Sequence, residues 1–305
     1  MKNSGLIKEN FENPRDYSYE KVCGGITYEE YPSYYMIPEE NMGTQKNQGS
    51  VGACVAETIA QIAEEWWRRQ LGKQEEHSEG FIYGGLRYTG STGWGMVVSR
   101  TMEKWMEIGT VPKSLFDILI EMPDMKEILN NRVDLFEVAK KYRLKGFVKL
   151  KGNDRDLQVK DALMKYQYGL VSAGGGHCMQ LVGWDDKKDK YICRDSYGYS
   201  NDGGNGYDFK NKNSVEEIYL PLFEEIKLPF VDVSEDAWYY KNVKNLYFAD
   251  LMNGTSDTTF EPDKIMTRAE GAALIDRLYS NMVNMMRTSN LNVNEKLDLL
   301  EEKIS

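Results

Sequence analysis

The sequence has few cysteines and histidines and no long apolar run. It contains four cysteines and two histidines among 305 residues. Four scattered cysteines are too few for a disulfide scaffold, and no two of them form the Cys-x-x-Cys pair of a zinc site. No segment approaches the roughly 20 consecutive apolar residues that a membrane-spanning helix needs. The sequence therefore predicts no disulfide-rich fold, no metal centre and no membrane span.

Positive charge is also scarce. Lys and Arg number 38 against 48 Asp and Glu, which gives a net charge of −10. This balance argues against a nucleic-acid-binding protein and against a polybasic protein of membrane surfaces. The first twenty residues lack an apolar segment and predict no secretion signal. A hydrophobic fraction of 41% over this length is enough for about two domains with cores of their own.

One long amphipathic helix dominates the predicted secondary structure. Apolar residues recur at spacings of three and four over Cys54–Leu71. Within it, Glu64 and Glu65 precede Arg68 and Arg69 by four residues, which is typical of exposed ion pairs. Further patterns predict helices at about 97–108, 125–142 and 157–166, and a hairpin of strands 179–184 and 190–195. The first 45 residues and the Gly-rich stretch 200–207 are expected to be irregular.

A cysteine at the start of the long helix is the first candidate for chemistry. Cys54 follows the glycine-rich segment Gln48–Ala53. The positive end of the helix dipole and the N–H groups there stabilise a thiolate, and with the amide of Gln48 they can hold an oxyanion. For an isolated cysteine, a plain buried side chain is the commoner case. The assignment therefore depends on a base for the thiol.

Only two histidines can supply that base. His77 lies in a polar run that predicts a solvated loop, whereas His177 follows three glycines and opens an apolar strand. His177 is therefore the better candidate. Folding the hairpin about Asp186 places Asp195 opposite His177, where its carboxylate can accept the far imidazole N–H. Taken alone, His177 is more commonly a hydrogen-bonded structural histidine at a strand start, and Asp195 is more commonly a turn or solvent-facing carboxylate.

Three segments, in the right order, resemble the motifs of the papain family of cysteine peptidases. Lys46–Cys54 is similar to the Gln-Gly-x-x-Gly-x-Cys motif, and Gly176–Trp184 to the histidine strand. Arg194–Gly198, followed by Gly204–Tyr207, is similar to the Asn-Ser-Trp-Gly…Gly-Tyr element. The resemblance covers about residues 25–220. It implies an α+β, two-lobed fold with a helical lobe and an antiparallel β lobe.

The resemblance also implies roles for individual residues. Cys54 would be the nucleophile, His177 the base, Asp195 the orienting residue and Gln48 the oxyanion-hole amide. Asp195 stands where the family usually has Asn, which alters the expected pH profile. The expected substrate-binding residues are Gly93, Trp94 and Gly95, as the counterpart of a glycine-rich strand, and Tyr197, which replaces a Trp.

A second resemblance begins after Pro229. The segments that carry it, all similar to one S-layer homology repeat, are Phe230–Val233, Ala237–Tyr239, Leu251–Thr255, Phe260–Asp263 and Thr267–Glu270. In that family the Arg of the Thr-Arg-Ala-Glu motif contributes to binding anionic cell-wall polysaccharide, which implies such a role for Arg268, with Trp238. Family members generally use three repeats. A lone, small helical module is expected to form a homo-oligomer, to pack on the preceding domain or to have lost wall binding.

These patterns predict four regions and one activity. The regions are an N-terminal extension (1–24), a papain-like domain (25–222), an S-layer homology repeat (229–282) and a helical tail (283–305). The predicted activity is a cysteine endopeptidase that needs no cofactor or metal and acts on a polypeptide or wall peptide through a thioester acyl-enzyme. Cell-wall association is expected if the protein is exported or released. The alternatives are a peptidoglycan amidase, endopeptidase or transpeptidase, and a catalytically decayed protein that binds wall polysaccharide.

Overall fold

The chain separates by its internal contacts into two units. The computed structural model describes residue 6 and residues 18–71, 74–87, 93–121, 126–200, 205–225, 227–248 and 251–280. The first unit is Met1–Glu225 and the second is Ile226–Ser305, and each is described by itself. The predicted helical tail lies wholly, and the predicted N-terminal extension mostly, outside the described residues.

The first unit combines helices with one antiparallel sheet, as predicted. Its helices are α1 (Tyr19–Cys23), α2 (Cys54–Leu71), α3 (Glu79–Leu86), α4 (Val98–Glu107), α5 (Lys126–Leu129), α6 (Val133–Ala139) and α7 (Arg155–Tyr166). Its strands are β1 (Tyr34–Met36), β2 (Gly146–Lys149), β3 (Leu170–Gly174), β4 (His177–Asp185), β5 (Lys190–Arg194), β6 (Tyr207–Asn211) and β7 (Glu217–Leu222). Short 3₁₀ turns are η1 (Glu39–Asn41), η2 (Lys113–Leu115), η3 (Lys140–Tyr142), η4 (Gly198–Ser200) and η5 (Lys212–Ser214).

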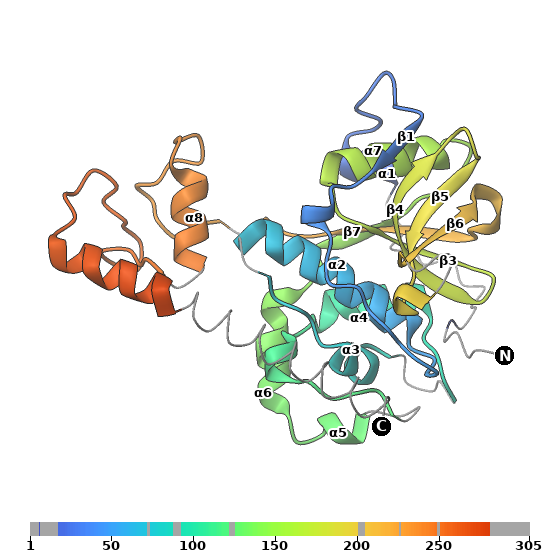
Figure 1. Cartoon of the computed structure of the whole chain (residues 1–305), viewed down its shortest axis with the longest axis horizontal. Coiled ribbons are helices and arrows are strands. Elements are labelled where there is room, and N and C mark those ends of the chain that lie inside the picture. Colours follow the sequence, from blue (N-terminus) through green and yellow to red (C-terminus); the bar gives the residue numbers. More distant parts are fainter. Residues whose placement is uncertain are drawn as a thin grey trace, which may run out of the picture. The chain divides into compact units, whose positions relative to one another are not determined.

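Helix α2 is the central helix of this unit, and both of its ends agree with the prediction. The strands lie on one side of it, and α3, α4, α5 and α6 gather on the other (Figure 1). Most of its apolar face is fully buried, Val55, Ile59 and Ile62 among them, whereas Trp66 is half-buried. The prediction that Glu64 and Glu65 are exposed was wrong, because both carboxylates are fully buried and accept hydrogen bonds from the backbone of the passing segments at Thr44, Gly43 and Gly169.

The predicted helix at 125–142 is broken in two. Helix α5 ends at Leu129, whose carbonyl accepts the N–H of Arg132, and α6 starts at Val133. Two consecutive asparagines, Asn130 and Asn131, lie in the break. Asparagine side chains compete for backbone hydrogen bonds and favour turns over helix interiors.

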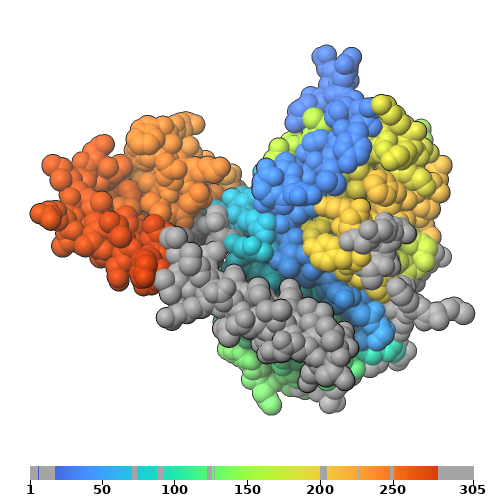
Figure 2. All heavy atoms as spheres, viewed as in Figure 1, coloured from blue at the N-terminus to red at the C-terminus, as the bar shows by residue number. Residues whose placement is uncertain are grey.

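In the described residues, seven strands form one sheet in the order β2-β7-β3-β4-β5-β6, with β1 paired to β4. Figure 2 shows the blue segment that carries α1 and β1 running along the surface beside the yellow strands. Part of the chain that was predicted to be irregular therefore adds a strand to the sheet.

A two-residue glycine turn joins β3 to β4 and sets the position of His177. The ladder pairs Gly174 with His177, and Gly175 and Gly176 between them have φ of 61° and 83°. Positive φ at both central residues defines a type I′ turn, which suits glycine. A side chain at Gly174 is also excluded, since its Cβ would lie 2.3 Å from the Ser214 carbonyl oxygen. His177 is thus the first residue of β4.

The predicted register of the β4–β5 hairpin was wrong by two residues. Folding about Asp186 pairs Leu181 with Tyr191, whereas the structure pairs Leu181 with Cys193. The register also shifts between Leu181 and Gly183, where an irregularity adds a residue to β4. Because a shift of two keeps every side chain on its face, Asp195 still comes to the face of His177.

The second unit has a small core around α8 (Tyr240–Phe248). Phe230, Val233 and Val243 are its buried apolar residues, with tyrosines and Phe260 packed around them. A second helix runs over residues 268–280. Thr267 caps it: its hydroxyl oxygen accepts the Glu270 N–H at 3.2 Å, and the Glu270 carboxylate accepts the Thr267 N–H at 2.7 Å. This capping box explains the Thr-Arg-Ala-Glu sequence.

Candidate active site

Cys54 is the first residue of α2 and has no exposed surface. Burial raises the pKa of its thiol well above the ordinary value of 9.0, and the neighbouring Cys178 thiol raises it further. The backbone N–H groups of Cys178 and Val55 reach the sulfur and oppose the rise. The sulfur therefore lies beside the backbone of the residue that follows His177. The helix start alone does not ionise this thiol, so a thiolate here needs a positive partner.

His177 and Asp195 are in direct contact. His177 Nε2 lies 2.9 Å from Asp195 Oδ1, and since a carboxylate only accepts, Nε2 carries the donated proton. Asp195 is buried, and its Oδ1 also accepts the N–H of Tyr197 at 3.2 Å. His177 Nδ1, the other ring nitrogen, is buried and makes no hydrogen bond to the part of the chain that the structure describes. Hydrogen bonds to a catalytic base are often loose without substrate and tighten in the complex.

Tyr197 covers the imidazole ring. The two ring centroids are 5.1 Å apart and the planes are inclined by 19°, which is a stacked arrangement. Only 9% of Tyr197 is exposed. Burial raises the pKa of its phenol, and the nearby Cys54 and Asp195 raise it further. Tyr197 thus shields the His177–Asp195 hydrogen bond from water.

Gln48 is buried and held by Ser196. The Ser196 hydroxyl donates to Gln48 Oε1 at 2.5 Å, and the Ser196 carbonyl accepts the Gln48 N–H at 2.7 Å. Gln48 Nε2 donates to the Val51 carbonyl at 2.6 Å, in the turn that leads to Cys54. The structure thus brings Gln48 together with the segment of Asp195. The two hydrogen bonds of Ser196 to Gln48 were not predicted, because only the position of Ser196 in the motif pointed to it.

Gly93, Trp94 and Gly95 form a segment fixed to the end of α3. The Arg87 guanidinium donates to the carbonyls of Gly93 and of Gly95, the latter at 2.9 Å, and the Tyr83 hydroxyl accepts the Gly95 N–H at 3.1 Å. Their part in substrate binding stays a prediction.

Trp238 and Arg268 belong to the second unit, where both are exposed.

His77 is not in a solvated loop. It is fully buried, its Nδ1 lies 2.8 Å from the Thr110 hydroxyl, and its ring packs edge-on against Tyr142. Burial lowers its pKa to about 3, and the charge of Lys46 adds to the shift. His77 is therefore neutral and structural. The prediction failed because a polar sequence around a residue does not reveal which element covers it.

A partly buried charge cluster next to the first turn of α2 was also missed. Lys46 Nζ lies 2.7 Å from carboxylates of both Glu76 and Glu79, and Lys113 Nζ lies 3.4 Å from Glu79. Glu57, three residues after Cys54, is 6% exposed. Burial raises its pKa to about 8, and the negative charge of Glu79 contributes.

Among the described residues, no group of three or more His, Cys, Asp or Glu side chains is arranged to hold a metal ion. None of the described helices is both long and apolar enough to cross a membrane.

Comparison with known proteins gives a family match within the second unit. Residues 229–272 match the family model of the S-layer homology domain. A stretch of 49 residues is 39% identical to part of an endoglucanase from Bacillus sp. (strain KSM-635), covering 16% of this chain and only 5% of that protein.

Solved structures similar to this chain are cysteine proteases. Xylellain from Xylella fastidiosa is 16% identical with a TM-score of 0.56, over 73% of this chain and 97% of that one. Digestive procathepsins L 3 and L2 of Tenebrio molitor are 16% and 17% identical, with TM-scores of 0.55 and 0.56, over 72% of this chain and 76% and 78% of theirs. The chain therefore has the papain-like fold of helices packed with an antiparallel sheet, and it carries an S-layer homology domain at residues 229–272.

Proposed function

We propose that the first unit is a cysteine endopeptidase that hydrolyses peptide bonds through Cys54, His177 and Asp195. One observation carries the proposal: the Cys54 sulfur, at the N-terminus of α2, contacts the backbone N–H next to His177, whose ring donates to a buried carboxylate at 2.9 Å. A nucleophile near a base that is itself hydrogen-bonded to an orienting carboxylate supplies the elements of covalent acyl transfer.

The chemistry has two halves. The Cys54 thiolate attacks the carbonyl carbon of the scissile peptide bond, and the resulting oxyanion takes hydrogen bonds from the Cys54 N–H and the Gln48 amide. His177 imidazolium then gives its Nδ1 proton to the leaving amine, which leaves a thioester on Cys54. In the second half, His177 takes a proton from water, the hydroxide attacks the thioester, and the acid product and the free thiol are released.

The burial of Cys54 assigns a specific task to His177. Since burial raises the pKa of the thiol, the thiolate forms only when the imidazolium beside it supplies an opposite charge. Thiolate and imidazolium must therefore coexist, and the rate should be bell-shaped in pH.

Digestion of a peptide library tests the proposal. Cys54→Ala should lower kcat/KM by at least about a thousandfold, because it removes the bond-forming atom. Cys23→Ala, which alters a thiol in α1 away from the site, is the matched control and should retain the wild-type rate. Equal activity of wild type and Cys54→Ala would refute the proposal.

The second unit supports a location for this activity. S-layer homology domains bind cell-wall polysaccharide, so we infer that the domain at 229–272 associates the enzyme with a cell wall. Wall peptides then become candidate substrates alongside polypeptides. Digestion of purified sacculi and of casein in parallel distinguishes the two, since a wall-specific amidase or endopeptidase clears sacculi and leaves casein intact.

A further inference from the structure

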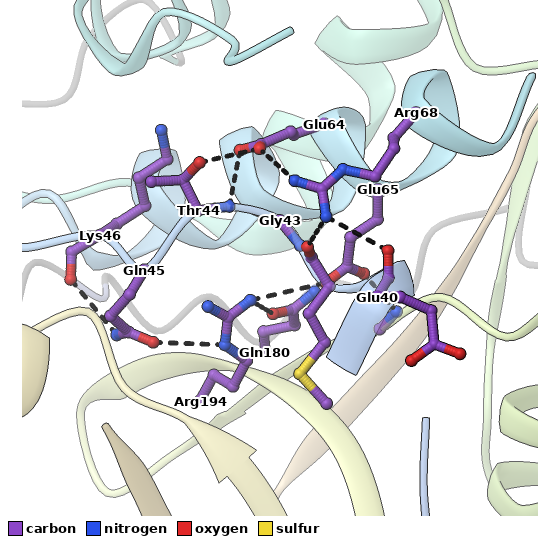
Figure 3. A network of polar contacts seen from close by, with 12 residues as sticks. Glu40, Gly43, Thr44, Gln45, Lys46, Glu64, Glu65, Arg68, Gln180 and Arg194 are labelled. Carbon is purple, nitrogen blue, oxygen red and sulfur yellow. Dashed lines mark hydrogen bonds and ion pairs between the residues drawn. The ribbon is translucent and has the colours of Figure 1, made fainter. Parts of the chain in front are cut away.

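A buried polar network lies behind Asp195. Arg194, the preceding residue, is 6% exposed, and its Nη1 lies 3.6 Å from Oε1 of Glu65 in α2. Nη1 also donates to Gln180 Oε1 at 3.4 Å, and Nε donates to Gln45 Oε1 at 3.2 Å (Figure 3). One guanidinium thus joins α2, β4, β5 and the segment before Gln48.

Glu65 gives this network a fixed anchor. Its carboxylate is fully buried and accepts the N–H of Gly43 at 3.0 Å and of Gly169 at 2.8 Å. Burial raises the pKa of Glu65, and the charge of Arg194 opposes the rise. Since separating a buried charge pair leaves an uncompensated charge, Arg194 is held at a fixed position relative to α2, the helix that begins at Cys54.

Gln45 connects this anchor to the catalytic segments. Its Nε2 donates to the carbonyl oxygens of Asp195 and, at 3.4 Å, of Lys46. A guanidinium can only donate, so Arg194 selects the oxygen end of the amide and turns the NH₂ end toward the two carbonyls. One amide thereby bridges the strand end that carries Asp195 and the segment that leads to Gln48.

We propose, building on the proposed function, that Gln45 and Arg194 are positioning residues of the active site. Arg194, fixed by Glu65, orients the Gln45 amide. The amide in turn holds the Asp195 backbone, so that the Asp195 carboxylate keeps the His177 ring aligned with Cys54. The network fixes the positions of the Asp195 segment and the Gln48 segment relative to α2, and its side chains do not contact the substrate.

Two substitutions of Gln45 test this role. Gln45→Glu keeps an acceptor for Arg194 but has no donor for the Asp195 carbonyl, and Gln45→Met keeps the size and removes both. Each should lower kcat about tenfold with KM within about twofold, as for the loss of one hydrogen bond that aligns the base. The rate of Cys54 alkylation by iodoacetamide at about pH 6, where the thiolate depends on His177, should fall by a similar factor.

Gln74→Met is the matched control. Gln74 Nε2 donates to Thr44 and to Glu64, so it belongs to the neighbouring contacts of α2 but not to those of Asp195. It should keep wild-type kcat and alkylation, and the midpoints of thermal unfolding of the three variants should agree. Arg194→Lys keeps a positive charge opposite Glu65 but loses the planar set of N–H donors of the guanidinium. It should lower kcat and the alkylation rate, as the Gln45 variants do.

Wild-type kcat and alkylation rates in both Gln45 variants would overturn the inference. The alkylation rate requires no turnover and therefore separates the two proposals. A wild type that alkylates selectively at Cys54 but cleaves no peptide refutes the proposed function and leaves the positioning role measurable.

Discussion

Three carboxyl groups and two ammonium groups meet beside the first turn of α2. Glu57, Glu76 and Glu79 lie near Lys46 and Lys113, and Asp117 lies at the edge of the group, 3.8 Å from Lys113. Glu57 is the carboxyl that keeps a proton at neutral pH, because burial raises its pKa to about 8, whereas the lysines hold the pKa of Glu79 below its ordinary value against the cost of burial.

This proton makes stability depend on pH through Glu57. Between pH 4.5, the ordinary pKa, and about 8, the folded state keeps a proton that the unfolded state has lost. The contribution to stability is therefore complete below pH 4.5 and declines as pH rises, by about 1.4 kcal/mol per pH unit. Glu57→Gln should remove this decline. The variant should match wild type in unfolding free energy at about pH 5 and exceed it at about pH 8.5.

Denaturant unfolding at the two pH values measures this difference. Asp117→Asn alters an exposed carboxyl at the edge of the same cluster and is the control, with equal effects at both values. A Glu57→Gln effect that is independent of pH would show that the carboxyl is ionised in the fold.

Single residues differ in how far the sequence revealed them. Cys54 and Gln48 lie within one motif and next to a strongly periodic helix, so local patterns were sufficient to select them. The partners of Glu57 and Glu65 lie 11 or more residues away in the sequence, and no local pattern records such contacts.

Among the elements, α3 shows why a short helix escaped prediction. Its sequence Glu79–Leu86 contains three glycines, which lower helix propensity. Gly80 is required by packing, since a Cβ there would lie 2.2 Å from the Ile118 carbonyl oxygen. The Ser78 hydroxyl compensates by accepting the Phe81 N–H at 3.0 Å as an N-cap. Tertiary packing thus overrode local propensity.

The segment between α2 and α3 makes the fold sensitive to acid through His77. Its pKa is about 3 in the fold and 6.5 ordinarily, so below pH 6.5 only the unfolded state takes up the proton. Stability should fall as pH decreases from 6.5 toward 3, by about 1.4 kcal/mol per pH unit from this residue. His77→Gln keeps a polar side chain for Thr110 and should make the acid decline shallower.

Chemical unfolding at a series of pH values between about 4 and 7 checks this slope. The control is the wild-type slope above pH 7, which His77→Gln should leave unchanged. Parallel slopes for wild type and variant below pH 6.5 would contradict a neutral, buried His77.

The β4–β5 hairpin marks another limit of sequence reasoning. The two strands and their polar turn were predicted, but the register depends on an extra residue near Val182 that no turn residue announces. The predicted His177–Asp195 contact is still present, because a register error of two residues leaves both side chains on the same face of the sheet. The motif resemblance implied the same pair independently of the register.

At the scale of the whole molecule, the chain joins a papain-like fold to an S-layer homology domain whose described core is small. Trp238 is 86% exposed. Several apolar side chains of the 268–280 helix are also exposed, and Ile275 among them is 67% exposed. Self-association of the chain through this domain stays a prediction.

Wall binding by the domain should depend on Arg268 and Trp238. Arg268 lies at the N-terminus of the 268–280 helix, where the helix dipole and a guanidinium both favour an anion. Arg268→Ala and Trp238→Ala should each weaken binding of the full chain to purified cell-wall polysaccharide by about tenfold. Lys264→Ala, a nearby exposed cation paired with Glu261, is the control. Equal binding of all variants would exclude these two residues from the contact.

The central claim is that His177 ionises a buried Cys54, and the pH dependence of iodoacetamide alkylation tests it most directly. All four cysteines are buried, and burial raises the pKa of Cys54 above 9.0. In the native wild type, Cys54 should react ahead of Cys23, Cys178 and Cys193 and already below pH 7, whereas His177→Ala should delay its reaction to above pH 9.0. Equal labelling of the four thiols, or an unchanged profile in His177→Ala, would contradict the account.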